Sequence, residues 1–410
     1  MHYVIIGNSA AAIGGIEGIR RIDPDGPITL ISSEERHTYS RPLISYLLCG
    51  KTDLQRMKYR PDDFYVRNRV RTLLGKTATD LNAEKRSITL DDGSKVSYDR
   101  LLIATGSRPF IPPVEGLDTV ENAFTFMSLD DAEALRKALG RRTRVLIMGA
   151  GLIGMKCAEG IARLCGQITV ADLAGHILPS ILDAEGADLV QKKTEQQGNI
   201  RFVLGDSVVS FQENQATLAS GKTLPFDLLV IAVGVRPNTE LFSSAGGAVG
   251  RGIRTDVKCA TSLKHIYAAG DCTESRDVVS DTDRVLALLP NAYMQGHTAG
   301  INMAGGEALY DKALAMNAMG MFGYHMITAG CYEGEEIVCA DGENYKKLFV
   351  RDDHLMGYIL IGDVRRAGIY TRLVRERIPL STINFALIKE KPQLMAFAKK
   401  ERRRQLATRQ

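Results

Sequence analysis

The 410-residue chain lacks any CxxC pair, and its seven cysteines are an odd number. These absences argue against a disulfide framework, a zinc ribbon and a cysteine-ligated iron–sulfur cluster. No apolar run approaches the ~18 residues that span a bilayer, and no basic segment or cleavage site precedes the apolar run at residues 3–6. We therefore expect a soluble, cytoplasmic protein without a membrane span, whose thiols are reduced and mostly buried.

An excess of charge of one sign is absent except at the C-terminal end. The last twelve residues, KKERRRQLATRQ, carry a net charge of +5, which leaves −1 for the other 398 residues of a chain whose total is +4. Nucleic-acid-binding proteins usually present a basic folded face with interleaved aromatics, so we expect no nucleic acid partner. An acidic protein partner for the tail is the favoured hypothesis, and a solvated helix end is the alternative.

The sequence contains an internal repeat. VIIGNSAAA, starting at Val4, reappears as VLIMGAGLIG, starting at Val145, so two predicted β-turn-α units lie 142 residues apart. Each is followed by a second apolar strand-like run, LLIATG ending at Gly106 and LLVIAVG ending at Gly234. The repeat predicts two similar nucleotide-binding units.

The second unit carries the complete dinucleotide-binding motif. A predicted strand ends at Met148, runs into GxGxxG and continues as a predicted helix over 155–165. The glycines allow a tight turn, close approach of the pyrophosphate, and packing of helix on strand, while the helix N-terminus attracts the phosphates. Asp172 ends the next strand, where it can accept hydrogen bonds from ribose hydroxyls. The predicted NAD residues are Gly149, Gly151, Leu152, Ile153, Gly154, Asp172 and Gly234.

The first unit is degenerate because its motif reads GxSxxA, in which Ser9 puts a Cβ where the pyrophosphate should come closest. Two other features support a nucleotide site. The acidic pair Glu34 and Glu35 follows the next strand, and the segment 261–271 is a predicted strand that ends in Gly-Asp. The carboxylate of Asp271 can accept a hydrogen bond from a polyol chain.

The order GxSxxA, ATG, GxGxxG and IYAAGD resembles that of the FAD-dependent pyridine nucleotide-disulfide oxidoreductase superfamily. The run YSRPLISYLL, from Tyr39, resembles its NADH:rubredoxin reductase and nitrite-reductase-like flavoprotein branch. The resemblance implies an α/β fold with two Rossmann-like dinucleotide-binding domains and a small α+β C-terminal domain. The implied segments are a discontinuous FAD-binding domain (1–111 and 240–316), an inserted NAD-binding domain (112–239), a C-terminal interface domain (317–395) and a basic tail (396–410).

The resemblance also implies the FAD contacts. The first turn would cradle the pyrophosphate, Glu34 would bind the adenosine ribose and Asp271 the ribityl chain. Arg41 and Pro42 would lie beside the flavin, and Pro290 would lead into a helix whose N-terminus faces the flavin pyrimidine. For Arg41 and Pro290, a surface ion pair or a simple turn are the alternatives. The implied FAD residues are Gly7, Ser9, Ala10, Ala11, Glu34, Arg41, Pro42, Ala78, Ala104, Thr105, Gly106, Gly270, Asp271 and Pro290.

Three departures from the superfamily bear on mechanism. The CxxxxC pair of its disulfide reductases is absent, and Pro42 stands where the peroxidase and oxidase branch has a redox cysteine. We expect nearby Cys49 to be a core thiol. Lys156 replaces a glutamate that many relatives carry close to the nicotinamide.

No side chain has a certain catalytic role, because hydride passes directly from nicotinamide to flavin, although Arg41, Pro42 and Lys156 are expected near the ring site. Without a cysteine pair, electrons must go to a rubredoxin, a ferredoxin-type iron–sulfur protein or oxygen. We expect an NADH-dependent FAD reductase of an acidic electron-transfer protein, present as a homodimer or in a complex, with no metal. The alternatives are an NADH oxidase, or the flavin subunit or redox sensor of a larger complex with little activity alone.

Overall fold

The computed structural model describes residues 1–399, so the predicted basic tail lies outside the described residues from residue 400 onward. Two compact units divide the chain. Unit 1 comprises Met1–Leu178, Glu195–Arg276 and Asp283–Ala313, and unit 2 comprises Pro179–Thr194, Asp277–Thr282 and the described residues from Leu314 onward. Within residues 1–399, no helix is long and apolar enough to cross a membrane.

Unit 1 contains two five-stranded parallel sheets with the same central arrangement. The first has the order β19-β7-β1-β2-β3 and the second the order β12-β11-β10-β16-β9. Their central strands are buried apolar runs, as is typical of parallel sheets covered on both faces. The first sheet consists of β1 (Tyr3–Ile6), β2 (Ile28–Ser32), β3 (Val70–Leu74), β7 (Arg100–Ile103) and β19 (Ile266–Ala268). The second consists of β9 (Ala123–Phe124), β10 (Arg144–Met148), β11 (Gln167–Asp172), β12 (Ile200–Leu204) and β16 (Leu228–Ile231).

These sheets confirm the predicted α/β class with two Rossmann-like units. The predicted helix over 155–165 is displaced, however. It is α5 (Leu152–Ile161), which begins directly after its N-cap residue Gly151 and ends four residues early. The other helices of unit 1 are α1 (Ala10–Ile22), α2 (Ile44–Leu48), α3 (Phe64–Arg67), α4 (Leu129–Ala138), α7 (Glu240–Ser244) and α8 (Leu289–Met303).

Shorter strands complete unit 1. The strands β8 (Ser107–Pro109) and β17 (Val235–Pro237) pair as an antiparallel ribbon that carries both chain crossings between the two parallel sheets. The remaining strands are β4 (Ala78–Asn82), β5 (Ser87–Leu90), β6 (Lys95–Ser97), β13 (Val208–Gln212), β14 (Gln215–Leu218), β15 (Thr223–Pro225), β18 (Ile253–Arg254), β20 (Thr273–Arg276) and β21 (Asp283–Arg284).

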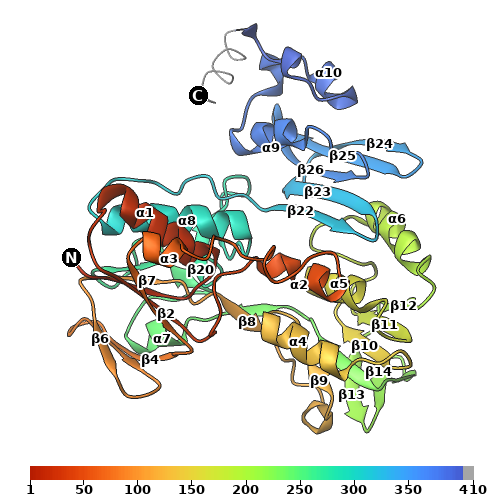
Figure 1. Cartoon of the computed structure of the whole chain (residues 1–410). Helices are drawn as coiled ribbons and strands as arrows, with labels where there is room; N and C mark the ends of the chain where they lie inside the picture. Colours follow the sequence, from red (N-terminus) through yellow and green to blue (C-terminus); the bar gives the residue numbers. More distant parts are fainter. Residues whose placement is uncertain (400–410) are drawn as a thin grey trace. The chain divides into compact units, whose positions relative to one another are not determined.

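Helices α1 and α8 lie side by side across a seam of glycines (Figure 1). A Cβ at Gly14 or Gly18 of α1 would overlap backbone carbonyls of α8, and a Cβ at Gly296 or Gly300 would overlap carbonyls of α1. The absence of side chains on both faces lets the two backbones approach closely. The seam therefore joins the beginning of the first sheet to residues almost 300 positions later.

Unit 2 is built on an antiparallel sheet of order β22-β23-β26-β25-β24. The strand-like runs predicted at 345–350 and 354–361 are strands β25 and β26. Lys347 on β25 donates to Asp183 just before α6, with Nζ to Oδ2 at 2.8 Å, which holds α6 to this sheet. The elements are β22 (Met316–Met321), β23 (Tyr324–Gly330), β24 (Glu335–Asp341), β25 (Asn344–Arg351), β26 (His354–Ile361), α6 (Ala184–Glu195), α9 (Ala367–Arg375) and α10 (Phe385–Glu390).

All seven cysteines are free thiols, and four of them are buried. The prediction that Cys49 is a core thiol is wrong, because it caps the C-terminus of α2 and is only half-buried. Its Sγ donates to the carbonyl oxygen of Tyr46 at 3.5 Å. The buried end of the helix is Leu48, and Cys49 lies one residue beyond it as the C-cap.

Candidate functional site

A cavity of about 510 Å³ opens at the carboxyl ends of the first sheet's strands. In parallel α/β sheets, this edge is where ligands bind. Thirteen of the fourteen predicted FAD residues line the cavity, and the exception is Pro290, which lies between the lining residues Leu289 and Ala292. The lining residues predicted from the sequence are Gly7, Ser9, Ala10, Ala11, Glu34, Arg41, Pro42, Ala78, Ala104, Thr105, Gly106, Gly270 and Asp271.

The first turn leaves space and N–H groups for a phosphate. Gly7 has a φ of +119°, and a Cβ there would overlap the carbonyl oxygen of Ala104. Ser9 is the N-cap residue of α1 with extended backbone, and its side chain makes no capping hydrogen bond. The first turn of α1 also holds no acidic residue. This helix end therefore suits an anionic ligand.

A second helix N-terminus borders the cavity at α8. Its N-cap residue, Leu288, offers no side-chain cap, and the first turn contains Pro290 and no acidic residue. Leu289 and Ala292 from this turn line the cavity. The positive end of the α8 dipole favours negative charge on a bound group.

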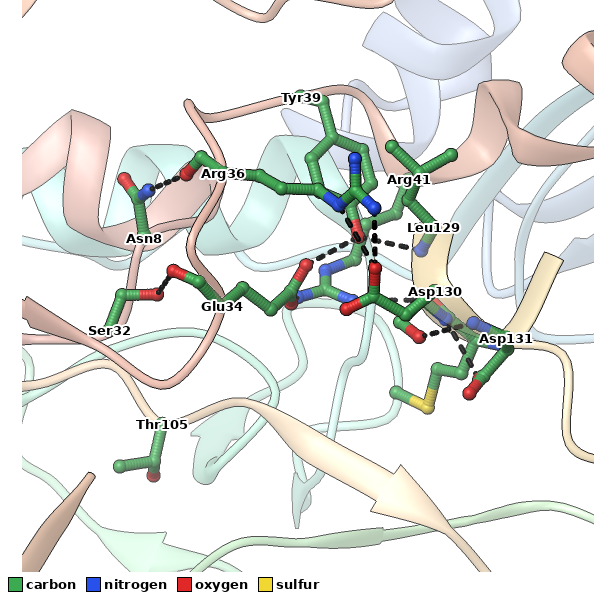
Figure 2. A network of polar contacts seen from close by, with 12 residues as sticks. Asn8, Ser32, Glu34, Arg36, Tyr39, Arg41, Thr105, Leu129, Asp130 and Asp131 are labelled. Atoms are coloured by element: carbon green, nitrogen blue, oxygen red, sulfur yellow. Dashed lines mark hydrogen bonds and ion pairs between the residues drawn. The ribbon is translucent and has the colours of Figure 1, made fainter. Parts of the chain in front are cut away.

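Figure 2 shows that Glu34 is held by two neighbours. The hydroxyl of Tyr39 donates to Glu34 Oε2 at 2.7 Å and accepts from the backbone N–H of Leu129 at 3.0 Å. The guanidinium of Arg41 forms an ion pair with the other carboxylate oxygen and donates to the carbonyl oxygen of Met127 at 3.2 Å. The ion pair considered for Arg41 is therefore present, on a residue that also lines the cavity.

Sequence reasoning did not assign Tyr39 a role, although it lies in the YSRP run. It also missed Arg36, which lines the cavity and donates to Asp130 Oδ1 at 2.7 Å. These contacts attach the loop after β2 to the start of α4 (Figure 2).

Arg41 and Asp271 give the cavity opposite charges. Burial raises the pKa of Asp271 and outweighs the charge of Arg41, which lowers it, so that the pKa remains above its usual value. Burial lowers the pKa of Arg41, but Tyr39 and Glu34 outweigh it and raise the pKa. A poorly hydrated carboxyl group of this kind gains from a hydroxyl donor on a ligand.

These features fit an FAD. The cradle at Gly7 and the helix end at Ser9 suit a pyrophosphate, and Glu34 and Asp271 line the same cavity with carboxyl groups that can accept hydrogen bonds from hydroxyls. When bound, FAD supplies two-electron and one-electron redox chemistry.

The second turn repeats the backbone of the first. Gly149 has a φ of +107°, and a Cβ there would overlap the carbonyl oxygen of Ala232. A Cβ at Gly154 would overlap the carbonyl oxygen of Gly149, whereas a Cβ at Gly151 would meet nothing within 4 Å. Leu152 and Ile153 open helix α5, and Gly234, with a φ of +119°, follows β16.

Asp172 lies against this turn. Its Oδ2 accepts from the backbone N–H of Ala150 at 2.6 Å, and its Oδ1 accepts from that of Ala174 at 2.7 Å. The sequence placed this acid 18 residues after Gly154, and the parallel pairing of β10 with β11 brings it back to the glycines. The predicted NAD residues thus gather around one helix end, apart from Gly234 on the neighbouring strand end.

Lys156 belongs to a cluster at the contact between α2 and α5. It forms an ion pair with Glu159, and its Nζ lies 4.1 Å from the ring centroid of Tyr46. The Nζ of Lys51 lies 3.0 Å from Glu159 Oε1. Burial raises the pKa of Glu159, but the hydrogen bonds and charges of both lysines outweigh it and hold the pKa below its usual value. No sequence pattern marks this cluster, because helices α2 and α5 are about 100 residues apart in the chain.

Two parallel sheets, each with a glycine turn that leads into a helix, are typical of dinucleotide-dependent oxidoreductases, and comparison with known families agrees. The chain belongs to the pyridine nucleotide-disulphide oxidoreductase family, whose signature matches residues 1–296. Residues 316–378 match the Rubredoxin NAD+ reductase C-terminal domain, which confirms the reductase branch of the family. The protein is an NADH-dependent oxidoreductase that uses FAD and NAD(H).

The matches to individual relatives cover from about three quarters of the chain to nearly all of it. The chain is 32% identical to the epsilon subunit of NADH-dependent phenylglyoxylate dehydrogenase from Aromatoleum evansii, over 93% of each chain. It is 27% identical to rubredoxin-NAD(+) reductase from Pseudomonas putida, over 74% of this chain and 80% of that one. The fold matches that of putidaredoxin reductase in its covalent complex with putidaredoxin, with a TM-score of 0.87, 23% identity and 98% of both chains covered.

Proposed function

We propose that the chain transfers electrons between NADH and a small acidic protein of the rubredoxin or ferredoxin type, through FAD bound in the unit 1 cavity. One observation carries this proposal: no cysteine is found among the described residues that line the cavity. A relay through a protein disulfide therefore has no thiol at this site, and the electrons must leave for an external acceptor. The rubredoxin reductase from Pseudomonas putida supports an acceptor of this class.

In this proposal, the predicted domain boundaries and site residues keep the roles given by the sequence. The first turn and the α8 N-terminus hold the FAD phosphates and pyrimidine, and Glu34 and Asp271 bind its sugar and ribityl hydroxyls. The second turn and Asp172 hold NADH. The carboxylate oxygens of Glu34 already accept hydrogen bonds from Arg41 and Tyr39. The adenosine ribose would therefore share these oxygens with both residues or displace Arg41.

The first experiment measures NADH turnover with separate acceptors. We expect the purified chain to be yellow and to reduce a rubredoxin or ferredoxin much faster than oxygen. An artificial dye serves as the control for electron transfer out of the flavin. A protein that stays colourless after incubation with FAD contradicts the proposal, as does an oxygen rate equal to the protein-acceptor rate.

The basic tail is proposed to recruit the acidic acceptor by electrostatic steering, since weak redox encounters depend on charge more than on buried area. We expect truncation after Phe397 to raise the apparent KM for the protein acceptor at low salt and to leave dye turnover unchanged. The difference should fade above about 0.1 M salt, where the Debye length is ~10 Å. Equal acceptor kinetics at low salt would leave the tail as a solvated chain end.

A second candidate function is the NADH-oxidising subunit of a larger cytoplasmic dehydrogenase. The epsilon subunit from Aromatoleum evansii favours it, because the match covers 93% of both chains. The subunit role predicts slow turnover with free carriers and a protein that co-purifies with this chain from its native source. A homodimer that is fully active with a free carrier would favour the first function.

A further inference from the structure

Helices α2 and α5 are in contact, and each begins next to one of the two predicted cofactor sites. Helix α2 begins two residues after the cavity-lining Pro42, and α5 begins at the second glycine turn. The helices pack closely, because a Cβ at Gly160 would lie 3.1 Å from the carbonyl oxygen of Ser45. Hydride transfer requires the nicotinamide to reach the flavin, and this helix contact joins the turn that holds one coenzyme to the cavity that holds the other.

The cluster at this contact has more positive than negative charge. Lys156 is 16% exposed and Glu159 is 5% exposed, and Lys51 pairs with the same carboxylate. Two lysines and one glutamate leave a net charge of +1. Tyr46, whose ring lies under Lys156, follows Pro42 by four residues, or about one helical turn. The excess charge thus lies about one turn from the cavity lining.

A fixed positive charge acts differently on the two forms of the coenzyme. The nicotinamide ring is neutral in NADH and carries a charge of +1 in NAD⁺, while the two forms share the same pyrophosphate. A nearby cation in a partly desolvated site therefore raises the free energy of bound NAD⁺ and leaves that of NADH almost unchanged. The attraction of the cation for the phosphates is the same for both forms, so it cancels in the ratio of the dissociation constants of NAD⁺ and NADH.

We propose that Lys156 is a specificity-determining residue that makes the site favour the reduced over the oxidised coenzyme. The negative charge of Glu159 offsets part of the positive charge of Lys156 and so limits the preference. The cluster thereby promotes release of NAD⁺ after hydride transfer. This inference rests on the proposed function only in placing the nicotinamide at the contact between α2 and α5, and it is independent of which acceptor takes the electrons.

The test compares two ligands on the full-length, FAD-loaded protein by titration calorimetry. The ligands are NAD⁺ and 1,4,5,6-tetrahydro-NAD, a neutral analogue that cannot donate hydride. The measured quantity is the Kd of NAD⁺ divided by the Kd of the analogue. We expect Lys156→Gln to lower this ratio roughly three- to tenfold, because Glu159 already offsets part of the charge. Lys156→Arg keeps the cation and should hold the ratio within about twofold.

Glu159→Gln should move the ratio in the opposite direction, because it removes the compensating charge and leaves both lysines. A packing defect cannot produce opposite shifts in two variants of one ion pair. Lys137→Gln, on the exposed last turn of α4, removes a lysine elsewhere in unit 1 and is the matched control, with no change expected. Melting temperatures of all variants report folding independently.

The proposal is overturned if both ligands weaken or tighten together in Lys156→Gln, which would indicate a structural or phosphate-binding role. It is also overturned if Glu159→Gln shifts the ratio in the same direction. Absence of protein-acceptor reduction would refute the proposed function and leave this measurement unaffected, since neither ligand transfers electrons in it.

Discussion

The two glycine-rich turns of unit 1 share a backbone and differ in the side chains that the backbone permits. Gly7 and Gly149 both have a large positive φ, and both would overlap a carbonyl oxygen of the adjacent strand if they carried a Cβ. The middle positions, Ser9 and Gly151, both have extended backbone, and a Cβ at Gly151 meets only open space. The comparison teaches that the fold requires the first glycine, whereas only a ligand requires the second.

The first glycines of the two turns should be the positions most sensitive to substitution. Gly7→Ala and Gly149→Ala should each lower the free energy of unfolding by about 3 kcal/mol, because backbone strain adds to overlap with a carbonyl. Gly93→Ala is the control, since Gly93 also has a positive φ but has nothing within 4 Å of the added Cβ. Chemical denaturation of the FAD-loaded chains measures all three. If either turn variant has the same free energy of unfolding as the native chain, the two first glycines do not have the same structural role.

The next effect separates the acids that accompany the two glycine turns. Asp271→Ala should weaken FAD binding about tenfold to a hundredfold, since a hydrogen bond to a charged group contributes roughly 1.5–3 kcal/mol. Asp172→Ala, beside the second glycine turn, should leave FAD affinity unchanged. Flavin fluorescence during equilibrium dialysis gives both dissociation constants. A loss of FAD affinity in both variants would mean that the acids support the fold rather than separate ligands.

A smaller effect is expected from copying the first turn into the second. Gly151→Ser should leave the melting temperature unchanged, because the protein offers open space to the side chain. It should weaken NAD⁺ binding about tenfold, as the added Cβ keeps the pyrophosphate from the backbone. Titration calorimetry checks the affinity. If NAD⁺ binds Gly151→Ser as tightly as the native chain, the middle glycine has no ligand-imposed role.

The smallest effect concerns coenzyme choice. Asp172 repels a 2′-phosphate, and the loop from Asp172 to Ile177 has no Arg or Lys to bind one. We expect NADH to be preferred, and Asp172→Asn to raise kcat/KM for NADPH relative to NADH about fivefold, because it removes the repulsion without creating a phosphate site. A native preference for NADPH would show that Asp172 does not face the adenosine ribose.

The sequence allowed accurate prediction of features that are local in the chain. Strands β1, β2, β10 and β26 are mostly buried apolar runs, and turn residues mark where each run ends. The first glycine motif falls at the cavity because such a motif specifies its own turn, and the ligand contacts of its residues stay predictions. The start of α5 was missed because its cap is a glycine of the motif itself, so that the helix begins three residues before the apolar run suggests.

Contacts between distant residues could not be predicted in this way. The sequence alone is compatible with two roles for Arg41, a surface ion pair and a position beside the flavin. The folded loop shows the ion pair with Glu34. The ion pair between Lys156 and Glu159 is local to α5, but its contacts with Tyr46 and Lys51 depend on how α2 packs. Packing of α6 against the unit 2 sheet likewise depends on Asp183 meeting Lys347, 164 residues later.

The glycine seam between α1 and α8 sets the order in which a growing chain can fold. Helix α1 leaves the ribosome long before α8, because the backbone that covers its glycine face spans residues 289–303. Non-local contacts of this kind delay folding until both partners exist. The flavin cavity, which also needs the start of α8, is completed at that same late moment. During synthesis, the second sheet has all its strands before the first sheet, so flavin loading follows the assembly of the NAD unit.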